Sequence, residues 1–244
     1  MIRNSSTRSG SAERARGFRN WAAVAGVTLL VSSWAHAVTT GDTYRYRLLN
    51  GYNGEAVADV QYQVAGVDGD RVTMTVSPDL SAAGGGERTE VVNRDGNGLR
   101  QQLYSHGAPM DYEFAAAYPA YAVPLDAGKS WSTRVAARVA GEGGQRSVRV
   151  DGRVVGRERV RVPAGEFDVI KIRRTVYPGD GQDFAQETQI YETEWYAPAL
   201  GRWVRKEIRS EYLDLSTCTK AGGCDVGGPW DVYELVEKRT SGAR

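Results

Sequence analysis

Cysteine, histidine and proline are scarce in this chain of 244 residues, which has 2 Cys, 2 His and 8 Pro. Two cysteines are too few for a small fold held together mainly by disulfides. With 41% hydrophobic residues the chain is too apolar to be disordered, and it lacks the Gly-X-Y repeat of collagen. It also has no uninterrupted apolar run of the roughly 20 residues that a membrane-spanning helix needs.

The first 37 residues have the pattern of a secretory signal peptide. Five arginines and one glutamate come first, an apolar run follows at residues 21–31, and small residues then surround Ala35-His36-Ala37. A basic region, a short apolar region and an A-x-A site predict a signal-peptide helix that is cleaved after Ala37. The alternative is a retained signal anchor. We expect cleavage, no remaining transmembrane anchor, and a periplasmic or secreted protein from a bacterium.

Cleavage changes the net charge of the chain. Without the charged residues of the first 37 positions, 26 basic and 29 acidic residues remain, and the formal charge is −3. A nucleic-acid partner requires a positive face, and the remaining charges alternate in sign along the chain. We therefore expect no nucleic-acid partner.

From residue 38 onward apolar and polar residues alternate with a period of two. Tyr44, Tyr46 and Leu48 share one face of a predicted strand, opposite Arg45 and Arg47. Further alternating runs lie at residues 60–64, 71–76, 170–173 and 204–208, and glycine-containing turn sequences separate them. One apolar and one polar face is typical of antiparallel sheets with a single buried side.

We therefore predict one all-β domain over residues 38–244, with antiparallel sheets that form a curled sandwich or an open half-barrel. A faint internal similarity suggests two meander halves, residues 38–117 and 124–244, which the proline-containing stretch 118–124 would join. Residues 112–118, with three consecutive alanines, are the one stretch after residue 37 that is compatible with a helix, and Pro119 would keep that helix short.

Three phrases carry a resemblance to a known group of proteins. They are residues 124–131 (PLDAGKSW), 162–167 (VPAGEF) and 195–205 (WYAPALGRWVR). This order resembles a group of exported bacterial proteins of unknown function with the pattern P-L-x-x-G-K-x-W, V-P-A-G-x-F and W-Y-A-P-x-x-G-x-V, and the match covers about residues 118–212. The resemblance implies a curled antiparallel sheet and an exported location, and no catalytic residue.

Turn chemistry explains the fixed residues of two of these phrases. Pro163 presets the backbone φ angle and Gly165 tolerates a positive φ, so residues 163–165 predict a hairpin turn. Pro198 cannot donate a ladder hydrogen bond and ends the preceding strand, and Gly201 then reverses the chain.

Cys218 and Cys224 enclose five residues, two of them glycine. In an oxidising compartment so short a loop permits a disulfide, which would contribute about 2 kcal/mol of stability. A redox motif would need C-x-x-C and a zinc site would need more ligands. We predict a structural disulfide, no metal and no cofactor.

Catalytic residues are harder to find. After cleavage His106 is the remaining histidine, and no G-x-S-x-G nucleophile sequence is present. Glu192 and Glu194 share a face of one predicted strand, with side chains roughly 6–7 Å apart. They suit either paired acid–base chemistry on a glycoside or a polar outer face balanced by Arg205 and Lys206. The second interpretation is favoured, so we assign no catalytic residue and expect no enzyme.

Aromatic residues are the remaining candidates for a functional site. Trp131, Trp195, Tyr196 and Trp203 are the predicted ligand-binding residues, although rings at strand spacing also suit a core. The function predicted from the sequence is a non-catalytic cell-envelope module that binds an apolar or glycan ligand, or a protein partner, in the concavity of a sheet. The alternatives are a carbohydrate-active enzyme that uses Glu192 and Glu194, and an assembly partner that pairs through an edge strand with another envelope protein.

Overall fold

The computed structural model describes residues 38–81, 85–182, 185–216 and 222–241. The signal-peptide helix predicted for the first 37 residues lies outside these ranges. Twelve strands and one short 3₁₀ helix follow in chain order: β1 (Thr43–Asn50), β2 (Ala56–Asp68), β3 (Arg71–Ser77), β4 (Arg88–Asn93), β5 (Gly98–Ser105), β6 (Ala108–Tyr118), β7 (Ser130–Val139), β8 (Gln145–Val162), β9 (Gly165–Tyr177), β10 (Gln189–Ala197), η1 (Pro198–Leu200), β11 (Arg202–Asp214) and β12 (Cys224–Arg239). Within the described residues, no helix is long and apolar enough to cross a membrane.

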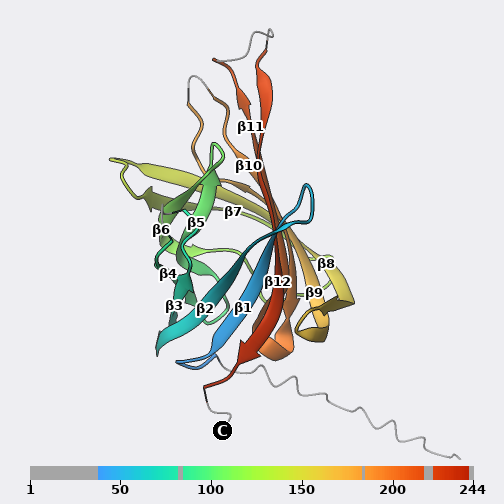
Figure 1. The fold of residues 1–244 in the computed structure, drawn as a ribbon. Coiled ribbons are helices and arrows are strands. Elements are labelled where there is room, and N and C mark those ends of the chain that lie inside the picture. The colour runs from blue at the N-terminus through green and yellow to red at the C-terminus, as the bar shows by residue number, and fades with distance from the viewer. Residues whose placement is uncertain (1–37, 82–84, 183–184, 217–221, 242–244) are drawn as a thin grey trace, which may run out of the picture. The chain divides into compact units, whose positions relative to one another are not determined.

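Each strand pairs antiparallel with the next one along the chain, and β1 pairs with β12. The twelve strands thus form a closed barrel (Figure 1). The prediction of an all-β antiparallel fold is confirmed, but the curled sandwich or open half-barrel is wrong. Sequence alternation predicts one buried face for all of these architectures, and it carries no signal for the long-range pairing that closes the sheet. Closure also removes the two unpaired edges that an open sheet would expose.

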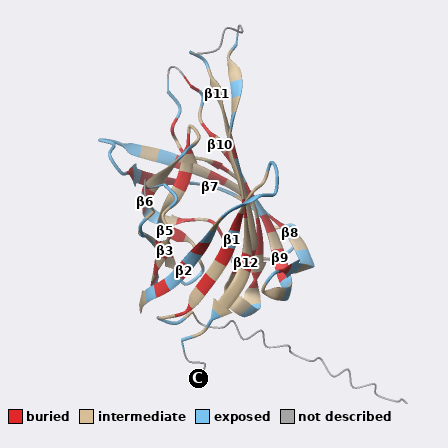
Figure 2. Cartoon of the chain, in the orientation of Figure 1, coloured by how far each residue is buried: buried red, intermediate tan, exposed pale blue. Residues whose placement is uncertain are grey.

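The apolar face predicted from the alternation is the interior of the barrel. Buried residues recur at every second position along many strands (Figure 2), as in β1, where Tyr44, Tyr46 and Leu48 are buried. Two clusters of buried apolar residues form the core. The first joins β1–β3 to residues of β8–β12, and the second lies mainly on β6–β9. A barrel of eight strands is just filled by its side chains, so a barrel of twelve requires large residues or leaves space.

The predicted turns lie where the sequence placed them. β8 ends at Val162 and β9 begins at Gly165, which has a φ of 136°. β10 ends at Ala197, η1 begins at Pro198, and Gly201 adopts a left-handed conformation with a φ of 62°.

The helix considered for residues 112–118 does not form, because these residues belong to strand β6. Tyr112, Phe114 and Tyr118 are buried there. Burial of these rings on the inner face of the barrel outweighs the helical preference of the three alanines.

The joint between the predicted halves is the segment between β6 and β7. Only residues 112–114 of β6 pair with β7, whereas Tyr118 at the end of β6 still pairs with Gly98 of β5. Tyr118, Ala120 and Tyr121 are each 7% exposed or less, so this stretch folds inward. Residues 118–121 are called the inner segment below.

We expect closure of the barrel to depend on the packing of β12 against β1. Leu235 is 0% exposed and pairs with Tyr46 across the closing seam, whereas Leu215 is 42% exposed. Leu235→Ala should lower the free energy of unfolding by about 2–5 kcal/mol. The control Leu215→Ala should change it by less than about 0.5 kcal/mol. Urea denaturation of both variants measures the difference, and equal losses would contradict the closed core.

Candidate functional site

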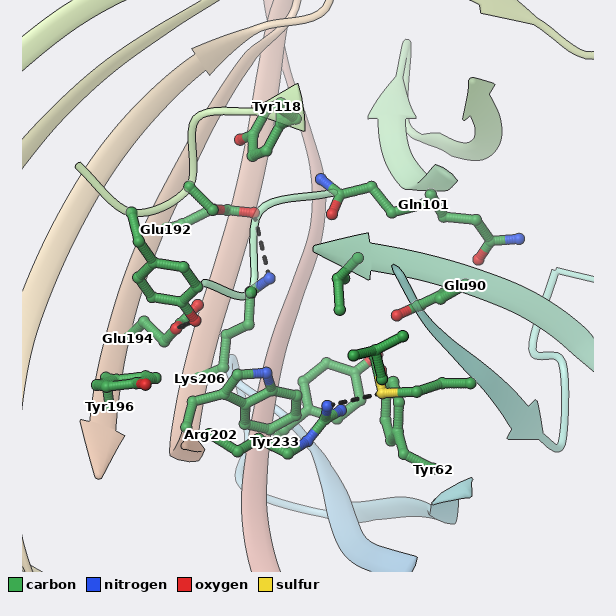
Figure 3. Close-up of a pocket in the computed structure, with 18 of the residues that line it drawn as sticks. Tyr62, Glu90, Gln101, Tyr118, Glu192, Glu194, Tyr196, Arg202, Lys206 and Tyr233 are labelled. Atoms are coloured by element: carbon green, nitrogen blue, oxygen red, sulfur yellow. Dashed lines mark hydrogen bonds and ion pairs between the residues drawn. The ribbon is translucent and has the colours of Figure 1, made fainter. Parts of the chain in front are cut away.

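The barrel encloses a cavity of about 360 Å³. Its wall includes apolar side chains, among them Val72, Met74 and Ile190, and it also includes tyrosines and charged residues. Carboxylates from β10 lie on one side and Glu90 and Gln101 lie on the other (Figure 3). Arg94 also lines the cavity and is exposed, so the cavity reaches the surface near the β4–β5 turn.

A buried ion cluster forms one side of this cavity. Arg174 on β9 donates from Nε to Glu192 Oε2 at 2.7 Å and from Nη2 to Glu194 Oε2 at 2.6 Å. The side chains of all three residues are at most 4% exposed. Because β10 pairs with β9, one guanidinium reaches two carboxylates that stand two residues apart on the neighbouring strand.

Lys206 on β11 completes the charge balance of this cluster. Its Nζ lies 3.4 Å from Glu192 Oε1 (Figure 3). Burial alone would raise the pKa of Glu192, but the positive charges of Lys206 and Arg174 outweigh burial and lower that pKa to about 2. Glu192 is therefore ionised at neutral pH and holds no proton to donate.

The same cluster holds the inner segment in place. Arg174 Nη1 donates to the backbone oxygen of Ala120 at 3.0 Å, and the Tyr121 hydroxyl donates to Glu194. Asn97 adds two hydrogen bonds, one to each backbone polar group of Tyr121. Burial and the nearby carboxylate of Glu194 raise the pKa of Tyr121 well above its usual value, so its hydroxyl remains a donor.

A second cation, the partly buried Arg202, lies at the other end of the cavity from Tyr118 (Figure 3). Four aromatic rings surround its guanidinium, with distances from Cζ to the ring centroids of 4.5 Å for Tyr62, 5.0 Å for Tyr44, 5.2 Å for Trp203 and 5.7 Å for Tyr46. Nε donates to the Tyr46 hydroxyl at 2.9 Å, and Nη1 lies 3.0 Å from the sulfur of Met74. Cation–π contacts of this kind stabilise a desolvated guanidinium.

Two of the four predicted ligand-binding residues line the cavity. Tyr196 continues the inward face of Glu192 and Glu194 on β10. The register between β10 and β11 shifts here: Trp195 pairs with Arg205, whereas the next residue, Tyr196, pairs with Trp203. Trp203 therefore shares the inward face of Tyr196.

The other two predicted residues do not line this cavity. Trp195 lies on the opposite face of β10, under Lys171 and Arg205, and is 7% exposed. Trp131 covers Gly152 on the paired strand, where an added Cβ would lie 2.1 Å from the indole ring, and it donates from Nε1 to Pro119 O at 2.9 Å. Both tryptophans pack against the protein itself.

Glu192 and Glu194 face the interior and not the polar outer face that the sequence favoured. Lys206 does balance Glu192, as that interpretation expected, but it does so inside the barrel. Sequence reasoning missed Arg174 and Arg202. The signal for Arg174 was its position: it alternates in phase with Ile170 and Ile172, which places its charge on the apolar face.

The predicted disulfide remains a prediction, because Cys218 lies outside the described residues, while Cys224 begins β12. His106 occupies the β5–β6 turn with a φ of 45°, and its backbone N–H donates to Thr188 Oγ1 at 2.9 Å. In the part of the chain that the structure describes, no group of three or more His, Cys, Asp or Glu side chains is arranged to hold a metal ion.

The sequence profile of a family described as DUF3108-like matches residues 101–212, a range that contains the three phrases noted in the sequence. No curated protein matches the chain at a significant level.

Three solved structures align with most of this chain. A protein named "putative lipoprotein" from Parabacteroides distasonis is 15% identical, with 82% of this chain and 96% of that chain covered and a TM-score of 0.46. A "putative exported protein with YmcC-like fold" from Bacteroides fragilis is 17% identical, with coverages of 83% and 97% and a TM-score of 0.44. The hypothetical lipoprotein YmcC from Escherichia coli is 11% identical, with coverages of 85% and 89% and a TM-score of 0.44.

Removal of Arg174 should destabilise the fold strongly. Arg174→Met leaves Glu194 without its cation inside the barrel, and the loss of one partner from a buried ion pair costs about 3–5 kcal/mol. The control Arg173→Met changes the adjacent arginine, which is exposed, and should cost less than about 0.5 kcal/mol. Chemical denaturation measures both free energies. Similar values for the two variants would contradict the described ion cluster.

The lowered pKa of Glu192 should make stability depend on pH in the acid range. A carboxyl group whose pKa is 4.5 when unfolded and about 2 when folded contributes stability that is complete above 4.5 and is lost as the pH falls toward 2. Denaturation midpoints at several pH values should therefore fall more steeply for the wild type than for Glu192→Gln. Parallel curves for the two proteins would show that Glu192 is not stabilised as an anion.

Proposed function

We propose that the chain is an exported, non-catalytic binding protein that holds one small amphipathic molecule inside its barrel. The observation that carries this proposal is the interior cavity of about 360 Å³, whose wall combines apolar side chains with a few convergent polar groups. Cavities of about 300–1,000 Å³ with such a lining are typical of small-molecule sites. The export part of the proposal is supported by the signal-peptide pattern of residues 1–37, whose A-x-A site predicts cleavage after Ala37.

The chemistry of the cavity argues against the carbohydrate-active enzyme. A glycosidase needs one carboxyl group that is protonated at working pH and a second that is free to act as base or nucleophile. Here one guanidinium binds both Glu192 and Glu194, and the pKa of Glu192 is lowered to about 2. The proposed sugar platform, Trp195, is covered by Lys171 and Arg205, which also weakens the case for a glycan ligand.

The closed pairing weakens the edge-strand assembly hypothesis. β1 pairs with both β2 and β12, so the junction of the first and last strands presents no free edge along the wall of the barrel. Strand addition needs an exposed edge. The interior cavity is thus the better-supported site.

A neutral fluorescent probe tests whether the cavity is accessible. N-phenyl-1-naphthylamine is weakly fluorescent in water and becomes brighter in an apolar site, so the full-length chain should bind it saturably with about one site per molecule. Val67 on β2 lines the cavity, whereas Val57 on the same strand is 58% exposed. Val67→Trp should fill part of the cavity and weaken binding at least about tenfold.

The control Val57→Trp adds the same side chain to the outside of the same strand and should bind the probe as the wild type does. Circular dichroism spectra and thermal melts establish that both variants are folded. If the wild type does not bind the probe, or if the two tryptophan variants bind it equally, the interior of the barrel is not a ligand site.

A further inference from the structure

We infer that the ligand is a small monocarboxylate with an apolar body, and that Arg202 together with the hydroxyl of Tyr44 binds its carboxylate. This inference rests on the proposed function and specifies the ligand of that same cavity. Two independent features carry it: a cation without a counter-ion and a buried hydroxyl without a hydrogen-bond partner, both on the cavity wall.

The first feature is the charge balance of the cavity. Glu192 and Glu194 are matched by Arg174 and Lys206, as described above. Arg88 binds Glu90 at 2.6 Å. No carboxylate of the described residues lies within ion-pair distance of Arg202, so the positive charge of this partly buried side chain remains uncompensated. A buried cation is stabilised most by an anion that pairs with it.

The hydrogen bonds of Arg202 leave part of its guanidinium available. Nε is used by Tyr46, and Nη1 contacts the weak sulfur acceptor of Met74. Nη2 has no partner among the residues that the structure describes. The surrounding rings satisfy the guanidinium electrostatically but supply no anion. The edge formed by Nη1 and Nη2 therefore retains the paired N–H geometry that binds a carboxylate with two hydrogen bonds.

The second feature is the hydroxyl of Tyr44. Tyr44 is 1% exposed and lines the cavity, and its Oη is buried with no hydrogen-bond partner in the described part of the chain. An unpaired buried hydroxyl destabilises a folded protein, so such a group calls for an explanation. The ring centroid of Tyr44 lies 5.0 Å from the Arg202 Cζ, so the side chain of Tyr44 and the unpaired cation lie on the same part of the wall.

The rest of the cavity sets the size and character of the ligand. If each non-hydrogen atom takes about the 30 Å³ of a liquid water molecule, 360 Å³ holds about a dozen such atoms. Val72, Leu103 and Ile190 line the cavity and provide apolar contacts for the body. Since Arg202 is the unpaired cation, a ligand with one negative charge is sufficient to balance it. Decanoate, with a carboxylate and an unbranched alkyl chain, has this size and charge.

Three ligands with one alkyl chain test the assignment on the wild-type protein. Isothermal titration calorimetry of the full-length chain with decanoate, decan-1-ol and decylamine at constant ionic strength compares a negative, a neutral and a positive head group. Decanoate should bind at least about tenfold more tightly than decan-1-ol, because a charge-assisted pair with a guanidinium is worth more than a neutral hydrogen bond. Decylamine should bind more weakly than both.

Two variants locate the carboxylate. Arg202→Met should remove the preference for decanoate over decan-1-ol, and Tyr44→Phe, which deletes one oxygen atom, should weaken decanoate binding severalfold without affecting decan-1-ol. Arg94→Met is the matched control, because it removes an exposed arginine from the rim of the same cavity. It should leave the preference unchanged. If Arg202→Met does not fold, the comparison of the three ligands and Tyr44→Phe still decides the question.

The outcomes separate this inference from the proposed function. Binding of N-phenyl-1-naphthylamine together with equal affinities for decanoate and decan-1-ol would overturn the carboxylate assignment and leave the interior ligand site intact. An equal loss of decanoate binding in Arg94→Met and Arg202→Met would also overturn it, since general electrostatic attraction would then explain the preference. The absence of binding by every probe would overturn both.

Discussion

The backbone pairing of β1 with β12 is the constraint on which the interior of this protein depends. It joins the first and last strands of the described barrel and closes the wall around the inward-facing side chains. Twelve strands enclose more volume than small aliphatic residues fill. Large tyrosines, two groups of buried charges and a cavity of about 360 Å³ occupy this volume together. The cavity is thus a consequence of closure at this strand number.

The buried charges have two different roles. Each guanidinium nitrogen of Arg174 donates to Glu192, Glu194 or a backbone oxygen of the inner segment, so Arg174 fixes the position of that segment. Arg202 has rings and weak acceptors around it but no anion. Because burial of an unpaired charge is costly, the contrast between these two arginines distinguishes a structural group from a binding group.

Much of the fold was predictable from the sequence, since the inward faces of β1, β2 and β3 and the turns at Gly165 and Gly201 follow from alternation and turn chemistry. Closure was not predictable, because a period of two is the same in a sandwich and in a barrel. The site was half predictable. Tyr196 and Trp203 line the cavity, and a register shift in β11 turns Trp203 inward. Trp195 lies outside the cavity. Arg174 and Arg202 were missed, and Glu192 and Glu194 were assigned to the outer face, because sheets normally place charged residues toward solvent.

The methionines offer the most direct test that a carboxylate ligand occupies the interior beside Arg202. Met74 is 3% exposed, lines the cavity and lies against the Arg202 guanidinium, whereas Met110 is partly buried in the second core cluster and does not line the cavity. In the NMR spectrum of protein labelled with ¹³C-methyl methionine, added decanoate should shift the Met74 methyl signal until it saturates and leave that of Met110 unchanged. A Met74 signal that stays in place while decanoate binds would contradict the account.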